Sequence, residues 1–121
     1  QQGFSVSYES AAHLFSKLER ERFSSSEENK QAAEAIRNAD LLILDDLGTE
    51  MPGQFVTAAL YTLVNDRLME GKPMIISTNL NIGEVAQRYN PQIASRLQGS
   101  FTRLTFVGED IRLIQSREGR R

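Results

Sequence analysis

The sequence contains no cysteine and no tryptophan, and it has only three prolines in 121 residues. Without cysteine, neither a disulfide framework nor a thiolate metal site is possible, which is compatible with a reducing cytoplasm. No apolar run approaches the length of a membrane span, and no signal segment opens the chain. We therefore expect a cytoplasmic protein with no membrane partner.

Neither positive nor negative charge predominates, since the formal net charge is only −2. This balance gives no overall attraction to nucleic acid, so any DNA contact requires a local basic patch. What is present is ordinary: 40% hydrophobic and 25% charged residues, as in a soluble globular protein. The length allows at most one small domain with a single hydrophobic core.

Two short apolar runs predict strands that are buried on both faces, 41–44 and 74–77. Between them, apolar spacing predicts a helix over 55–69, which Gly71 ends. The alternation from Phe4 to Tyr8 predicts a strand with one buried face. The same reasoning predicts helices at 10–23, 26–39, 82–88 and 92–98, and strands at 104–107 and 111–115. This alternation of strands and helices predicts an α/β fold built on a parallel sheet.

Polar side chains follow both buried runs. Asp45 and Asp46 end the first, and Thr78 and Asn79 end the second. In a parallel sheet these strand ends lie at the same edge, where ligands bind in open α/β folds. One carboxylate there can hold Mg²⁺ through water, a second can deprotonate an attacking water, and Asn79 can position that water. Taken alone, the same residues are also compatible with ordinary turns.

Five segments in order resemble the helicase-loader ATPases of the DnaC and DnaI type, which are similar to the transposition helper ATPases of the IstB type. Both groups belong to the AAA+ class. The segments are LLILDDLGTE, ALYTLVNDRL, GKPMIISTNL, IASRL and FVGEDIRL. The resemblance covers residues 3–114 and implies a partial AAA+ domain with a P-loop NTPase-like core over 1–116, followed by a flexible tail at 117–121.

The resemblance implies roles for the polar residues at the strand ends. In the Walker B segment, 41–48, Asp45 resembles the acid that holds Mg²⁺. Asp46 occupies the place of the catalytic base, which is glutamate in many AAA+ relatives. In the sensor-1 segment, 74–80, Asn79 resembles the polar residue that touches the nucleotide.

Two arginines in the segment 92–112 also match the family pattern. Arg96 resembles the arginine finger, a catalytic residue that reaches a neighbouring subunit's nucleotide. Arg112 resembles the sensor-2 arginine, which binds nucleotide in its own subunit. A planar, permanently charged guanidinium suits both tasks. Without the resemblance, surface salt bridges would be the simpler interpretation of both residues.

Residues 10–39 correspond to the helical insertion of the initiator and loader clade, which is implicated in single-stranded DNA contact. Four cations there are candidate DNA-binding residues, and two aromatic rings are candidates for base stacking. These are Lys17, Arg20, Arg22 and Lys30, with Phe15 and Phe23. Glutamates are interspersed among them, so a solvated helix face with mixed charges is the alternative interpretation.

The phosphate-binding motif G-x-x-x-x-G-K-[ST] does not occur in these 121 residues. In the family's sheet the strand that precedes this motif lies between the strands predicted at 74–77 and 104–107. We therefore expect a fragment whose parent protein uses ATP and Mg²⁺, while the fragment itself binds neither tightly. We also expect a gap in the sheet, whose unpaired edges favour self-association.

The resemblance implies that the parent protein is an ATPase that loads the replicative DNA helicase onto single-stranded DNA, working as a ring or filament. A transposition helper ATPase of the IstB type is the alternative within the same class. A non-enzymatic association module is an alternative from a different class, but a degenerate domain would not require the whole set of candidate site residues. A Mg²⁺-dependent phosphatase or receiver-type site lacks the additional acid and lysine that such sites need.

Overall fold

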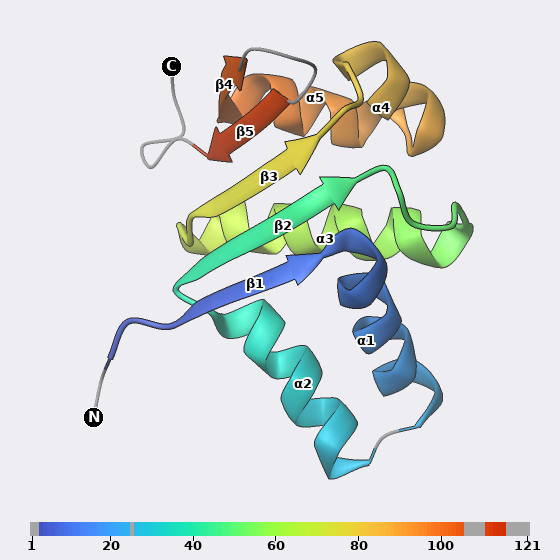
Figure 1. Cartoon of the computed structure of the whole chain (residues 1–121), viewed down its shortest axis with the longest axis vertical. Coiled ribbons are helices and arrows are strands. Elements are labelled where there is room, and N and C mark those ends of the chain that lie inside the picture. The colour runs from blue at the N-terminus through green and yellow to red at the C-terminus, as the bar shows by residue number, and fades with distance from the viewer. Residues whose placement is uncertain (1–2, 25, 106–110, 116–121) are drawn as a thin grey trace.

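The computed structural model describes residues 3–24, 26–105 and 111–115. The elements within these residues follow the order that the sequence predicts, starting with a strand (Figure 1). In chain order they are β1 (Val6–Ser10), α1 (Ala11–Phe23), α2 (Glu27–Asn38), β2 (Leu41–Leu47), α3 (Gln54–Glu70), β3 (Met74–Thr78), α4 (Ile82–Arg88), α5 (Pro91–Ser100), β4 (Phe101–Thr105) and β5 (Ile111–Gln115).

The strands form one sheet in the order β1-β2-β3-β5-β4. β1, β2 and β3 run parallel, and the helical crossovers between them make this possible. β5 is antiparallel to β3, and β4 is antiparallel to β5. The α/β fold with a parallel central sheet is therefore confirmed, and it is that of a P-loop NTPase-like core.

Polar side chains and a glycine set the ends of the helices. The hydroxyls of Ser10 and Ser26 accept hydrogen bonds from backbone amides in the first turns of α1 and α2. At α4, Asn81 and Glu84 form a reciprocal capping box. Gly71 ends α3 in the left-handed conformation at φ 71°, which glycine adopts without a steric penalty. These local signals explain why the predicted helix bounds agree closely with the structure.

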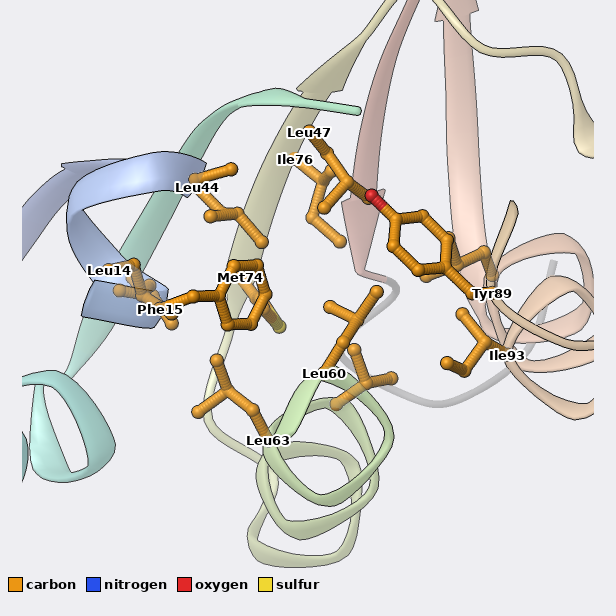
Figure 2. Packing of buried hydrophobic residues seen from close by; sticks show 14 of the residues in the cluster. Leu14, Phe15, Leu44, Leu47, Leu60, Leu63, Met74, Ile76, Tyr89 and Ile93 are labelled. Atoms are coloured by element: carbon orange, nitrogen blue, oxygen red, sulfur yellow. The ribbon is translucent and has the colours of Figure 1, made fainter. Parts of the chain in front are cut away.

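The helices cover one face of the parallel strands. Leu42, Leu44, Met74 and Ile76 point to this face and are fully buried. Figure 1 shows α3 passing behind the strands, and Figure 2 shows helix side chains packed against strand residues. The helices contribute the remaining large apolar residues of this core, which include Leu14, Phe15, Ile36, Leu60, Leu63, Val64, Tyr89, Ile93 and Leu97.

The opposite face of the parallel strands is less covered by the residues that the structure describes. Leu41, Ile43 and Ile75 point to it and are only half-buried, so the prediction that β2 and β3 are buried on both faces holds for one face only. Val6 and Tyr8 of β1 are 54% and 63% exposed. The predicted strand with one more buried face is therefore present, but its half-buried side carries Ser7 and Glu9 and not the apolar residues. Ser7 and Glu9 lie beside Leu42 and Leu44 in the register of the sheet, on the face that the helices cover, and the Glu9 carboxylate pairs with Lys17 of α1 at 2.7 Å.

The expected gap beside β3 is also absent, since β5 pairs with β3 along residues 75–78. β4 begins directly after α5, at Phe101 rather than at residue 104, and its predicted end at 107 lies outside the described residues. Only five residues separate β4 from β5. A connection of this length allows an antiparallel hairpin but no parallel crossover. The hairpin therefore occupies the place that the prediction left open.

In the described part of the chain, no helix combines the length and the apolar character needed to cross a membrane. The tail predicted at 117–121 lies outside the described residues.

Candidate functional site

The two acids at the end of β2 lie at a break in the strand's regular geometry. Asp46 has φ 58°, the only positive φ among the described residues other than glycine. The pairing with β3 shifts register between Leu44 and Leu47, so this segment forms an irregularity in the ladder. Aspartate adopts the left-handed conformation more readily than most residues. As a result, Asp46 is exposed at the carboxyl edge of the sheet.

Hydroxyl groups from both neighbouring strands contact Asp45. The Tyr8 phenol of β1 donates a hydrogen bond to Asp45 Oδ2 at 2.8 Å. The Ser77 hydroxyl of β3 donates to Asp45 Oδ1 and accepts the backbone N–H of Asp46 at 2.9 Å. The hydroxyl of Ser77, which is buried, therefore links both acids to the neighbouring strand β3.

The turn after Asp46 is tightly constrained. Thr49 donates its backbone N–H and its hydroxyl to the Asp46 carbonyl, at 3.2 and 2.8 Å. Gly48 has φ 108°, and a Cβ there would lie 2.9 Å from the Leu80 side chain. Both the backbone conformation and this close approach to the loop after β3 require glycine.

Glu50 anchors the same loop from within the protein and is only 5% exposed. Its Oε1 accepts the Gly48 N–H at 2.9 Å, and its Oε2 accepts the Tyr89 hydroxyl and the Arg88 Nε. Arg88 also donates to the Glu50 carbonyl oxygen. Burial, together with this carboxylate, raises the pKa of Tyr89 well above its ordinary value, so the phenol stays protonated and donates. The loop after Asp46 is thus fastened to the end of α4.

The structure brings the predicted sensor-1 residue to the same edge as the acids. Leu47 of β2 pairs with Thr78 of β3, and Asn79 follows directly and is exposed. The Thr78 hydroxyl donates to the Leu47 carbonyl and accepts the Leu80 N–H, so it closes the local turn. The turn interpretation therefore applies to Thr78, while Asn79 faces outward.

The two candidate arginines lie on different elements. Arg96 is exposed on α5, beside a shallow depression shared with Tyr61, Gln92, Ser95 and Ser100. No ion pair of Arg96 is formed within the described residues. Arg112 lies in β5, and its backbone is opposite Ser77 in the register of the sheet. The roles predicted for both arginines stay predictions.

The candidate DNA-binding cations all lie on α1 and α2. Lys17 forms an ion pair with Glu9, whereas Arg20, Arg22 and Lys30 are exposed. The Arg22 guanidinium lies 5.8 Å from the Phe23 ring centroid and 5.6 Å from that of Phe55. Phe23 is 75% exposed, but Phe15 is only 3% exposed. The suggestion that Phe15 stacks on a base is therefore wrong, because this ring belongs to the core.

A cleft of about 390 Å³ lies between α1, α2 and α3, and Arg22 is the only predicted site residue that lines it. Its lining includes both acidic and basic side chains, among them Glu21, Arg37, Asp66 and Glu70. This mixture favours neither an anionic nor a cationic ligand. Asp45, Asp46 and Asn79 do not line the cleft, so it lies apart from the acidic edge of the sheet.

The donor set at the acidic edge fits Mg²⁺. No cluster of three or more histidine, cysteine, aspartate or glutamate side chains suited to a metal occurs in the ranges that the structure describes. Mg²⁺ does not require such a cluster, because it is commonly held by one or two carboxylates together with waters and substrate phosphates. Asp45 and Asp46 supply such carboxylates at the strand end.

A protein-family model described as IstB-like ATP binding protein matches residues 1–115. This match covers nearly the whole chain. The chain belongs to the IstB-like ATP-binding protein family. No match is found among curated proteins. Family membership agrees with the IstB-like part of the resemblance in the five sequence segments, and it places the chain in an ATP-binding class of protein.

Four residues that contact the acids or their loop in this IstB-like site were not predicted as site residues from the sequence: Tyr8, Ser77, Glu50 and Arg88. Ser77 was expected only as part of a buried strand, and Glu50 only as part of a loop. A signal for Glu50 was present, since a lone acid close after a strand-end turn can bind the turn's own amides. No local pattern indicates Tyr8, because its partner Asp45 lies 37 residues away.

Proposed function

We propose that this chain is part of an AAA+ ATPase that loads a replicative helicase onto single-stranded DNA. The observation that carries the ATPase part is the adjacency of Asp45 and Asp46 with Asn79 at the carboxyl edge of the parallel strands, in a chain of an ATP-binding family. The helicase-loading part rests on the resemblance of the five sequence segments to DnaC-type and DnaI-type loaders.

In this proposal Asp45 would hold Mg²⁺ together with waters, and Asp46 would accept the proton of the attacking water as that water bonds to the γ-phosphorus of ATP and the bond to the ADP oxygen breaks. Asn79 orients that water from the neighbouring strand. ATP supplies the phosphoryl group and the remaining Mg²⁺ ligands when bound. Arg96 acts on the nucleotide of an adjacent subunit, and Arg112 acts on its own. Because aspartate is one methylene shorter than glutamate, we expect slow hydrolysis.

A transposition helper ATPase of the IstB type is the second candidate, and membership of the IstB-like ATP-binding family is compatible with both candidates. Such a protein assembles on double-stranded DNA with a transposase. The two candidates share the same chemistry at Asp45 and Asp46, so they differ in partner and in DNA form. The basic residues Arg20, Arg22 and Lys30 on α1 and α2 are the proposed DNA contacts in either case.

The test is a titration of fluorescent Mg-ATP into two proteins, this 121-residue chain and the same chain extended upstream through whatever its gene encodes. We expect binding only by the longer protein. Asp46→Ala should then lower kcat by about 100-fold or more, the range for loss of a general base. Tight binding by the 121 residues would overturn the expected dependence on a phosphate loop, and binding by neither would favour the association module.

Stimulation of hydrolysis separates the two candidates. The longer protein is assayed with a single-stranded oligonucleotide and with the duplex of the same sequence at equal salt, since DNA affinity depends steeply on ionic strength. Stronger stimulation by the single strand supports the helicase loader. Stronger stimulation by the duplex supports the transposition helper.

A further inference from the structure

The Asp45 carboxylate is held from two sides by hydroxyl groups of neighbouring strands. Tyr8 reaches Oδ2 from β1 and Ser77 reaches Oδ1 from β3, so the carboxylate cannot rotate without breaking a hydrogen bond. The two contacts come from residues 37 and 32 positions away in sequence. Such an arrangement is a property of the folded sheet rather than of the Walker B segment itself.

Ser77 has a second function in the same geometry. Its hydroxyl accepts the Asp46 N–H, in the segment where the backbone turns into the left-handed region. One oxygen atom therefore fixes the orientation of the first acid and the backbone position of the second. Because Ser77 is 7% exposed, water competes little for these hydrogen bonds.

We propose that Ser77 and Tyr8 are positioning residues that orient Asp45 for a divalent cation, with Ser77 also setting the position of Asp46. A carboxylate has about four lone-pair positions, so hydroxyl donors and a hydrated cation can share it. Loss of an outer-shell partner typically weakens metal affinity by about 10-fold to 100-fold. The proposal deepens the proposed ATPase function and rests on it for the identity of the cation.

The composition of the chain offers a test that does not depend on ATP. The chain has three tyrosines and no tryptophan. Tb³⁺, a hard cation that prefers oxygen ligands, emits when a tyrosine close to it is excited. A Tb³⁺ ion on Asp45 would lie next to the Tyr8 phenol, which is 2.8 Å from Oδ2. Sensitised emission therefore locates the ion, and calorimetric titration of Tb³⁺ gives its Kd for each variant.

We expect sensitised emission from the wild-type chain and none from Asp45→Asn or Tyr8→Phe. Ser77→Ala should raise the Tb³⁺ Kd by about 10-fold or more, and Ser77→Thr, which keeps the hydroxyl, should restore it. A merely structural role of Ser77 would lower the melting temperature without this selective change in Kd. Tyr61→Phe and Ser16→Ala serve as matched controls that remove a ring hydroxyl and a serine hydroxyl elsewhere.

Three results would overturn the inference: no Tyr8-dependent emission from the wild type, emission that survives in Asp45→Asn, or an unchanged Kd in Ser77→Ala and Tyr8→Phe. Failure of the ATPase proposal gives a different pattern. In that case Tb³⁺ binding still depends on Asp45, Tyr8 and Ser77, but the upstream-extended protein does not hydrolyse ATP. This result would remove the ATPase function and leave the positioning role of Tyr8 and Ser77 intact.

Discussion

Glu50 and Arg67 are charged side chains that lie buried in the protein, with 5% and 1% exposure. The Glu50 carboxylate is surrounded by hydrogen-bond donors, and the Arg67 guanidinium is surrounded by carbonyl acceptors. Arg67 donates to the carbonyls of Arg37, Ala39 and Pro73 at 2.8 to 3.1 Å, although its Nε has no partner in the described structure. Glu50 accepts from Gly48, Arg88 and Tyr89. Removing one partner from such a buried set leaves the others unsatisfied.

Glu50→Gln should destabilise the fold by about 1–3 kcal/mol. The amide keeps the size of the carboxylate but replaces one acceptor oxygen with an N–H donor. That donor must face the Gly48 N–H on one side or the donors Tyr89 and Arg88 on the other. Urea-induced unfolding followed by circular dichroism measures the loss.

Glu70→Gln is the matched control, because the Glu70 carboxylate is 55% exposed and pairs with Lys72 at 3.6 Å. We expect it to change stability by no more than about 0.5 kcal/mol. Equal effects of the two variants would show that the Glu50 network contributes nothing beyond an ordinary surface acid.

At the scale of elements, α1 and α2 form a pair that is joined to the rest of the molecule by few polar links. Glu21 of α1 accepts two hydrogen bonds from the Arg37 guanidinium of α2, at 2.5 and 3.1 Å. Arg67 of α3 then binds the carbonyls at the end of α2 and before β2. Glu21 and Arg37 are partly exposed, at 25% and 45%, so solvent screens their attraction.

Stability should depend on pH through this pair. Hydrogen bonding to Arg37 lowers the pKa of Glu21 below its ordinary value of 4.5. A lowered folded-state pKa adds stability that is present above pH 4.5 and is lost as pH falls through the folded-state value. We expect Glu21→Gln to lose less than about 1 kcal/mol at pH 7, and this difference from wild type to disappear in strongly acidic solution.

Urea titrations of the wild type and of Glu21→Gln, from pH 7 to strongly acidic solution, measure the difference in their free energies of unfolding. Glu19→Gln removes an exposed carboxylate from the same helix without touching the ion pair, so its effect on stability should not follow the same pH dependence. A difference between Glu21→Gln and wild type that stays constant into acid would contradict the assigned pair.

At the scale of the whole molecule, the sheet is covered unevenly. Helices bury Leu42, Leu44 and Ile76 on one face, while Val6 and Tyr8 stay exposed on the other at the β1 edge. Exposed apolar side chains on an edge strand favour pairing with another chain. Self-association remains a prediction, but its expected place moves from a gap beside β3 to the β1 edge.

Val6→Lys should reduce concentration-dependent association, because a charged side chain on an edge strand opposes strand pairing. Static light scattering over a range of concentrations measures the mass. Met69→Lys is the control, since Met69 is also exposed, at 82%, but lies on α3. A wild-type chain that stays monomeric at the highest concentration would contradict this prediction.

Much of the fold could be predicted because its signals are local. Ser10, Ser26 and Gly71 mark helix ends, and apolar runs mark the strands β2 and β3. The adjacency of the ends of β2 and β3 followed from the parallel pairing, which the structure confirms. The alternation in β1 predicted one buried face but could not identify it, because alternation shows that two faces differ and not which of them the helices cover.

The sequence by itself determined the order of the elements, the family and the placement of Asp45, Asp46 and Asn79 at strand ends, because each depends on neighbours along the chain. Only the tertiary structure decided which side chains hold those acids. Tyr8 and Ser77 reach Asp45 across strands that are far apart in sequence, and β5 fills the place beside β3 because a short hairpin returns there. Contacts of this kind depend on register and packing, which no local pattern specifies.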